Sequence, residues 1–290
     1  MSAAGKIIAR CWIARAVDYC RLHRWPLVTL WLMVVLTCLS GPTAFAQVEA
    51  GLHMSVEPGG GEVTAVRSGT VVVYAVLSYQ NATDTELKVQ VRRDPGVVLF
   101  EQSAVYNGSG QTNIEISGRD ILAGYVSAAQ QRSDELVEVV DRAQQASSAR
   151  AKRLHTESAV FFVTALDSVL AALERYPLPS ETLDSLPPAR KLADQVEAMG
   201  LAIINDVPDD ELDSELARLE TLVTETVAAV DLTMDGIDTH REWPLIDGTY
   251  PTQLYRNGQI SQGFVWEVSP EGTPGVPWMG FKIFLPLVTK

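Results

Sequence analysis

The longest stretch without a helix breaker constrains this chain more than any other feature. From Asp120 to Tyr176 the 57 residues contain one glycine, Gly124, and no proline, and alanine, leucine, valine, glutamate, glutamine and arginine dominate. This composition predicts a helix that begins near Ser117 or Asp120, since both residue types favour the N-cap position. An unbroken helix would extend roughly 85 Å at about 1.5 Å per residue, and Ser147-Ser148 is one place where it could bend.

Two shorter helices are predicted to follow and to pack against the first. Pro187 or Pro188 suits the first turn of a helix that runs to about Ile204. A third helix begins near Asp210, and its inward positions recur at intervals of four and three residues: Leu212, Leu216, Leu219, Val223, Thr226 and Val230. Because such a stripe needs a partner helix, residues 119–242 are expected to form an antiparallel, coiled-coil-like three-helix bundle.

The flanking segments, residues 47–118 and 243–290, carry the pattern of short β-strands. Strands are predicted over 70–79, 87–92, 97–104 and 114–116, separated by turn formers. Near the C-terminus, Asn257-Gly258 indicates a hairpin. The expected fold class is α+β: an antiparallel β-sandwich-like module formed by the N- and C-terminal segments and interrupted by the helical bundle. The pattern leaves open whether the two segments share one sheet.

Residues 1–46 have the three parts of a secretory signal peptide. Five basic residues precede an apolar core of 13 residues from Leu27 to Leu39, and small alanines precede a cut between Ala46 and Gln47. An uncleaved membrane anchor is the alternative, although a spanning helix needs about 20 apolar residues. Acylation of Cys38 is a third interpretation. Cleavage would remove all the cysteines of the chain, which are Cys11, Cys20 and Cys38.

The charge of the chain excludes whole classes of partner. Without residues 1–46 it has 18 Lys and Arg against 35 Asp and Glu, a formal charge of −17. A nucleic acid or an anionic membrane would need a concentrated basic patch to overcome that field. The densest candidate, Arg150, Lys152 and Arg153, is too short for this role. We therefore expect no nucleic-acid partner, and a membrane partner only if the leader is retained.

The sequence contains no recognisable catalytic constellation, and no cofactor is expected. The densest group of possible metal ligands is Asp235, Asp238 and His240, at the end of the third predicted helix. Solvated helix-terminal charge is the simpler interpretation of that group. A second group, Tyr255, Trp266 and Trp278, could stack on sugar rings, since aromatic side chains on a β-surface bind flat apolar faces. Packing in a core is the alternative for these three.

Two stretches resemble parts of known exported proteins. Residues 71–117, with Arg93-Asp94-Pro95-Gly96-Val97-Val98 between two predicted strands, are similar to the immunoglobulin-like β-sandwich modules of secreted bacterial proteins. The ending Ile283-Phe284-Leu285-Pro286-Leu287-Val288 resembles short apolar tails of exported proteins in some filamentous green bacteria. Neither resemblance implies catalytic residues.

These observations predict an exported, non-enzymatic binding or structural module in the bacterial cell envelope or outside the cell. Its expected partner is a protein or a cell-surface component. One alternative is a periplasmic adaptor that touches its partner through the tip of a helical hairpin near Pro177 to Pro188. Another is a carbohydrate-binding protein that uses the C-terminal aromatic residues. Retention of the leader would instead anchor the same module to the membrane.

Overall fold

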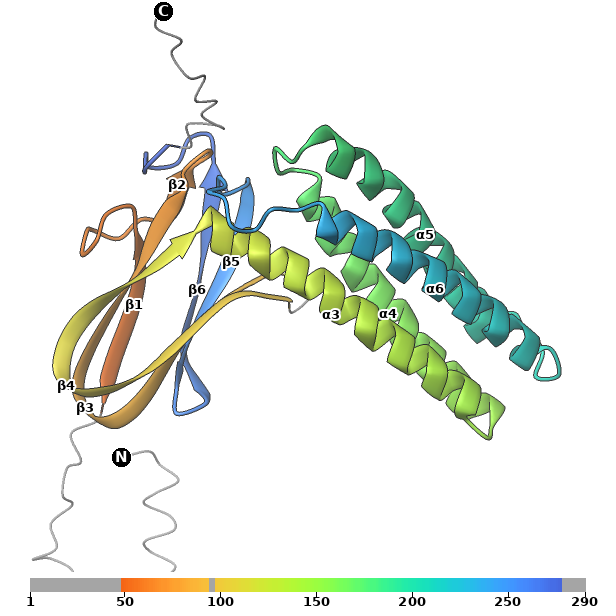
Figure 1. The fold of residues 1–290 in the computed structure, drawn as a ribbon. Helices are drawn as coiled ribbons and strands as arrows, with labels where there is room; N and C mark the ends of the chain where they lie inside the picture. Colours follow the sequence, from red (N-terminus) through yellow and green to blue (C-terminus); the bar gives the residue numbers. More distant parts are fainter. Residues whose placement is uncertain (1–47, 94–96, 278–290) are drawn as a thin grey trace, which may run out of the picture. The chain divides into compact units, whose positions relative to one another are not determined.

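The structure, a computed structural model, describes residues 48–93 and 97–277, which belong to one compact unit, Val48–Lys290. The predicted signal peptide with its cut at Ala46 and Gln47, the turn at 94–96 and the segment 278–290 lie outside the described residues. The described fold is α+β, with six strands and four helices (Figure 1). The strands are β1 (Glu49–Ser55), β2 (Ala65–Arg67), β3 (Val72–Arg93), β4 (Val97–Ser117), β5 (Gly248–Arg256) and β6 (Gln259–Ser269). The helices are α3 (Gly118–Gln145), α4 (Ala149–Leu173), α5 (Ser180–Asn205) and α6 (Leu212–Asp235).

The described strands form one mixed sheet that curls into a half-barrel, so the predicted antiparallel β-sandwich is wrong. The strand order is β1-β3-β5-β6-β2, with β4 paired along β3, and β2 runs parallel to β6. The two terminal segments share this sheet, because β3 pairs with β5 and β2 pairs with β6. Figure 1 shows the curl in the long β3 and β4.

The curl follows from β-bulges in two strands that are longer than the sequence predicted. Asn81 and Asp84 adopt positive φ values of 55° and 42°, and the register of β3 with β4 shifts there, so the expected turn becomes a bend. The first half of β3 then pairs with β1 and the second half with β5. On β1, the side-chain amide of Gln262 hydrogen-bonds to the backbone of Leu52 as a neighbouring strand would. It donates to Leu52 O at 2.9 Å and accepts from Leu52 N at 2.9 Å. Bulged strands thus bend one sheet where two sheets were expected.

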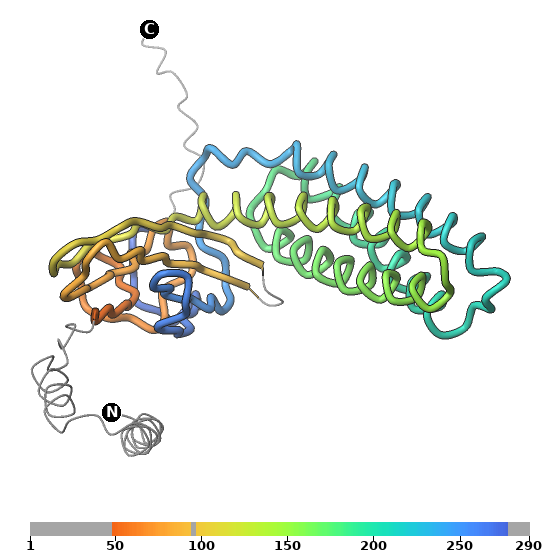
Figure 2. The backbone as a smooth tube through the Cα atoms, turned by 90° about the horizontal axis from the view of Figure 1, so that it is seen from below, coloured from red at the N-terminus to blue at the C-terminus, as the bar shows by residue number. Residues whose placement is uncertain are grey.

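The predicted long helix is two helices, so the bundle has four helices among the described residues and not three. α3 ends at Gln145, Ala146 is extended, and Ser148 caps α4 by accepting a hydrogen bond from Ala151 N at 3.2 Å. α3 packs on α4 and α6, and α5 also packs on α4 and α6 (Figure 2). An isolated long helix would leave its apolar side in water, whereas the reversal buries Val139 and Val163 in one core.

Shorter sequence signals match the structure to different degrees. The stripe on α6 is confirmed, because all six of its residues are buried. The hairpin is confirmed as well: Asn257 and Gly258, with φ of 48° and 78°, connect β5 to β6. The start of α5 is wrong, since the helix begins at Ser180 and contains Pro187 and Pro188. Tertiary packing outweighs the proline signal there.

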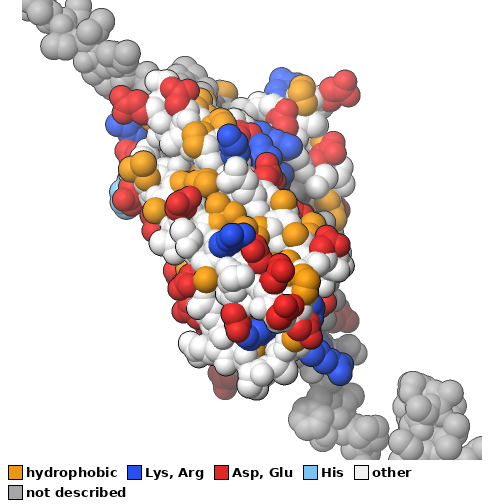
Figure 3. Space-filling view, turned by 90° about the vertical axis from the view of Figure 1, so that its right-hand side faces the viewer, with side chains coloured by type: hydrophobic (Ala, Val, Ile, Leu, Met, Phe, Trp, Pro, Cys, Tyr) orange, Lys and Arg blue, Asp and Glu red, His pale blue; other side chains and the backbone are white. Residues whose placement is uncertain are grey.

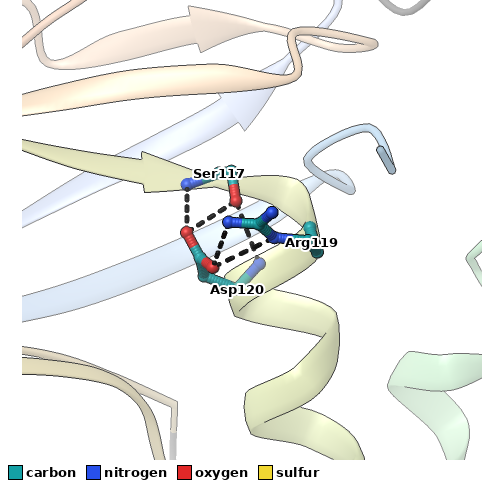
Figure 4. A network of polar contacts seen from close by, with 3 residues as sticks. All are labelled: Ser117, Arg119 and Asp120. Atoms are coloured by element: carbon teal, nitrogen blue, oxygen red, sulfur yellow. Dashed lines mark hydrogen bonds and ion pairs between the residues drawn. The ribbon is translucent and has the colours of Figure 1, made fainter. Parts of the chain in front are cut away.

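The bundle joins the sheet without a linker. Ser117, one of the two predicted N-cap positions, ends β4 and caps α3. Its N–H donates to Asp120 Oδ2 at 3.1 Å and its Oγ accepts from Asp120 N at 3.1 Å (Figure 4). Gly118 and Gly124 then allow backbones to approach closely, since a Cβ there would overlap the carbonyl oxygens of Trp243 and Leu99 respectively. Buried residues of the sheet and of all four described helices consequently form one hydrophobic core.

Candidate functional site

The predicted metal ligands lie near one another in sequence but do not converge on a point. Asp235 ends α6, and Asp238 and His240 follow in the turn toward β5, with all three residues exposed. The Asp238 carboxylate accepts the backbone N–H of His240 at 3.0 Å and pairs with Arg241 Nε at 2.7 Å. Within residues 48–93 and 97–277, no group of three or more His, Cys, Asp or Glu side chains is arranged to hold a metal ion.

The predicted sugar-stacking residues are separated by the sheet. Trp266 is 1% exposed, stacks on Tyr250 with ring centroids 4.6 Å apart, and donates from Nε1 to Thr252 Oγ1 at 3.0 Å. Tyr255 lies on the opposite, outer face of β5, because burial alternates along that strand. Trp278 lies outside the described residues. Of the two described residues of this group, only Tyr255 reaches the surface.

Tyr255 belongs to a polar ladder across β4, β3 and β5. Its hydroxyl donates to Gln253 Oε1 at 2.7 Å, and Lys88 Nζ lies 5.0 Å from its ring centroid. Lys88 also pairs with Glu101 at 3.4 Å, and Gln90 donates to the same carboxylate. The hydrogen bond from Gln90, followed by the interaction with Lys88, lowers the pKa of Glu101. These groups satisfy one another, as cross-strand pairs that set the register of a sheet do.

The distal loops of the bundle are not where the sequence placed a hairpin tip. Tyr176 and Leu178, in the connection from α4 to α5, are buried in the core shared with the sheet. The loops 146–148 and 206–211 lie at the other end of the helices (Figure 1). There Arg153 Nη1 pairs with Asp209 at 2.6 Å, and Lys152 pairs with Asp213. Acidic groups of the α5–α6 region thus neutralise part of the predicted basic cluster.

The outer face of α4 exposes two large apolar side chains. Leu154 is 60% exposed and Phe161 is 53% exposed. They are seven residues apart, about two helical turns, and therefore share a face. By length and composition α4 is the one helix in the described chain apolar enough to cross a membrane, and half of its most apolar window is buried inside the protein. We call Leu154 and Phe161 the α4 patch.

Neighbouring helices hold α4 firmly while leaving this face open. α5 approaches closely because Gly200 faces α4, where a larger side chain would collide with Val160. Farther along, Arg190 of α5 binds both Asp167 of α4 at 2.7 Å and Glu174, the residue that caps the C-terminus of α4, at 2.9 Å. On the face seen in Figure 3, apolar side chains reach the surface among acidic ones. The α4 patch is therefore carried by a helix whose position is well determined by packing.

The sequence analysis did not identify the α4 patch, because it predicted one long helix over 120–176 without assigning a buried and an exposed face to it. A signal was nevertheless present in the spacing. Thr156, Ala159, Val163, Leu166 and Leu170 repeat every three or four residues and are buried. Leu154 and Phe161 lie roughly half a turn away from the centre of that stripe, which places them on the solvent side.

Comparisons with protein-family models, with curated proteins and with solved structures found no match to this chain.

Proposed function

We propose that the protein is an exported, non-enzymatic protein-binding module and that the α4 patch is its binding surface. The exposure of Leu154 and Phe161 on one helical face carries the proposal. Large apolar side chains two turns apart are the pattern by which helices anchor partners. The leader supports export, and the core shared by sheet and helices supports a rigid presentation of α4.

The partner that fits this surface is a protein segment with apolar anchors and basic flanks. Residues 119–242 contain 24 acidic and 11 basic residues, a net charge of −13. Apolar contact with the patch would supply affinity, while a positive rim on the partner would be attracted by the acidic bundle and would speed association. A second copy of this chain is the weaker fit, because two such bundles would repel one another.

A photo-cross-linking residue in place of Phe161 tests this proposal in cells of the producing organism. We expect it to capture a partner with a basic surface, which mass spectrometry identifies. The purified partner should then bind the wild-type protein, and Leu154→Ser or Phe161→Ser should weaken binding at least about tenfold, as loss of an interface anchor does.

Leu232→Ser is the matched control, because Leu232 is a 72% exposed apolar residue on α6 and lies outside the α4 patch. It should leave binding unchanged. Circular dichroism should show wild-type helicity in all three serine variants, since each side chain is more than half exposed. The proposal fails if Phe161→Ser binds the captured partner as well as the wild type does, or if only a second copy of this chain is captured.

A further inference from the structure

One side of β4 is a long strand edge without a partner strand among the described residues. β4 pairs with β3 over its whole length, and none of the other described strands pairs with it. α3 covers only the beginning of this edge, where Gly124 lies against the backbone of Leu99. Over residues 101–113, every residue except Tyr106 and Thr112 is exposed. Since alternate residues of an edge strand direct their N–H and C=O groups away from the paired side, this edge offers a row of backbone donors and acceptors.

The chain covers the two other edges of the described sheet with its own residues. On β1, the Gln262 side chain bonds to the backbone as described above, and Met54 O accepts from Val63 N at 2.8 Å. On β2, Arg67 N donates to Thr273 O at 2.9 Å. β4 therefore carries the one long open edge of the described sheet.

β4 lacks the residues by which exposed strand edges usually avoid pairing. It contains no lysine, arginine or proline, and its only charged residues are Glu101 and Glu115. The Glu101 carboxylate is already bound by Lys88 and Gln90 of β3. Val105 adds an apolar side chain that is 62% exposed. An edge with so little free charge accepts another strand without electrostatic repulsion.

A bend limits the straight part of this edge to residues 101–106. Gly108 adopts a φ of 77°, and the register of β3 with β4 shifts at the same level. Ser103 lies opposite Lys88, which is opposite Tyr255 of the outer polar ladder, so Ser103 and Val105 share the outer face of the sheet. The segment 101–106 is thus a short, straight strand whose outer face is exposed.

We propose that the protein forms a two-fold dimer in which residues 101–106 of β4 pair antiparallel with the same residues of a second copy. An antiparallel pair of identical strands is self-complementary, because each strand offers the other the same alternation of N–H and C=O groups. The reversed direction sets Glu101 beside the Val105 end of the second copy, so the two Glu101 carboxylates do not meet. Because the described sheet has one long open edge, this pairing closes at two copies and does not extend into a fibre.

The acidic bundles are kept apart in this arrangement. The beginning of β4 lies against α3 at Leu99, and from there residues 101–106 run toward the bend, away from the bundle (Figure 1). Since the paired strands run in opposite directions, the bundle end of one copy lies beside the bend of the other. The repulsion that disfavours contact between two α4 faces is therefore weakened here by separation and by salt.

Sedimentation equilibrium of the exported protein tests this dimer. We expect a monomer–dimer equilibrium, and Val105→Lys should raise its dissociation constant at least about tenfold, because each copy then adds a charge to the junction. Val265→Lys is the matched control: Val265 is a 57% exposed valine on β6, which is paired on both sides, and its replacement should leave the constant unchanged. A wild-type protein that stays monomeric at every concentration, or equal constants for Val105→Lys and the wild type, would overturn the proposal.

Hydrogen exchange of the wild-type protein locates the interface without any substitution. Backbone amides within residues 101–106 should exchange at least about tenfold more slowly at concentrations where the dimer dominates than where the monomer does. Slower exchange confined to α4 would instead place the interface on the α4 patch and would overturn pairing through β4. Phe161→Ser should dimerise like the wild type. Because that variant removes an anchor of the α4 patch and leaves β4 intact, failure of partner binding and failure of dimerisation are separate results.

Discussion

At the scale of single residues, edge-to-face aromatic contacts hold the end of the bundle nearest the sheet, which we call its root, against the sheet. Tyr176 packs against Tyr125 at 6.1 Å and against Trp243 at 6.5 Å between ring centroids. Arg93 Nη1 donates to the Tyr125 hydroxyl at 2.6 Å. Burial raises the pKa of Tyr125, Tyr176 and Tyr250, because the charged phenolate would lose its hydration. These side chains come from α3, the α4–α5 connection, the linker before β5 and the sheet, so they couple the two halves of the fold.

Two tyrosine-to-phenylalanine changes should have opposite consequences at this root. The Tyr176 hydroxyl is buried without a hydrogen-bond partner among the described residues, whereas Tyr250 donates to Ile246 O at 2.7 Å. Tyr176→Phe should keep or raise the free energy of unfolding, by up to about 1 kcal/mol, while Tyr250→Phe should lower it by about 1 kcal/mol. Urea denaturation measures both. A loss for Tyr176→Phe as large as that for Tyr250→Phe would show that its hydroxyl is satisfied.

At the scale of elements, the sequence predicts caps and stripes better than it predicts where a long element stops. Ser117, the α6 stripe and the Asn257-Gly258 turn follow from signals within a few residues. The break falls at Ser147-Ser148, where the sequence indicated a possible bend, but no glycine or proline there announces a full reversal. The burial of both helices against each other shows that the chain reverses. At Asn81 and Asp84, turn-forming residues occupy β-bulges that bend one continuous strand. From local propensity alone, the same residues predict a turn between two strands.

Ser148 is expected to determine where α4 begins. Its Oγ accepts from Ala151 N, so Ser148→Ala should lower the free energy of unfolding by about 1 kcal/mol. Ser147→Ala is the matched control, since Ser147 is the adjacent exposed serine and does not occupy the N-cap position. Chemical denaturation compares the two variants. If they were equally stable, the cap would not set the reversal, and packing between α3 and α4 alone would account for it.

At the scale of the whole molecule, one core joins the sheet to the bundle, and a second core fills the distal part of the bundle. Leu166, Leu170 and Leu173 of α4 share the first core with strand residues such as Val89. The sheet therefore cannot lose its packing without uncovering the near end of all four described helices. Cooperative unfolding of strands and helices follows from this arrangement.

Alkaline titration tests that coupling. Burial raises the folded-state pKa of Tyr125, Tyr176 and Tyr250 above the value of about 10 in an unfolded chain. Their contribution to stability is fully present below pH 10 and is lost as the pH rises toward the folded-state values. We expect the far-UV circular dichroism of the helices and the fluorescence of Trp243 and Trp266 to change together above about pH 10. Helix loss at a pH where both tryptophans stay shielded would show that bundle and sheet unfold separately.

Short-range chemistry in the chain is enough to specify an α+β alternation, the cap at Ser117, the hairpin at Asn257-Gly258 and the inward stripe of α6. Each of these depends on hydrogen bonds or side-chain spacing within a few residues. The curl of the sheet, the reversal between α3 and α4 and the exposure of the α4 patch depend on contacts between distant segments. An apolar residue carries the same local signal whether it faces a core or solvent. Leu154 and Phe161 became a surface only when α3 and α5 had covered the opposite side of α4.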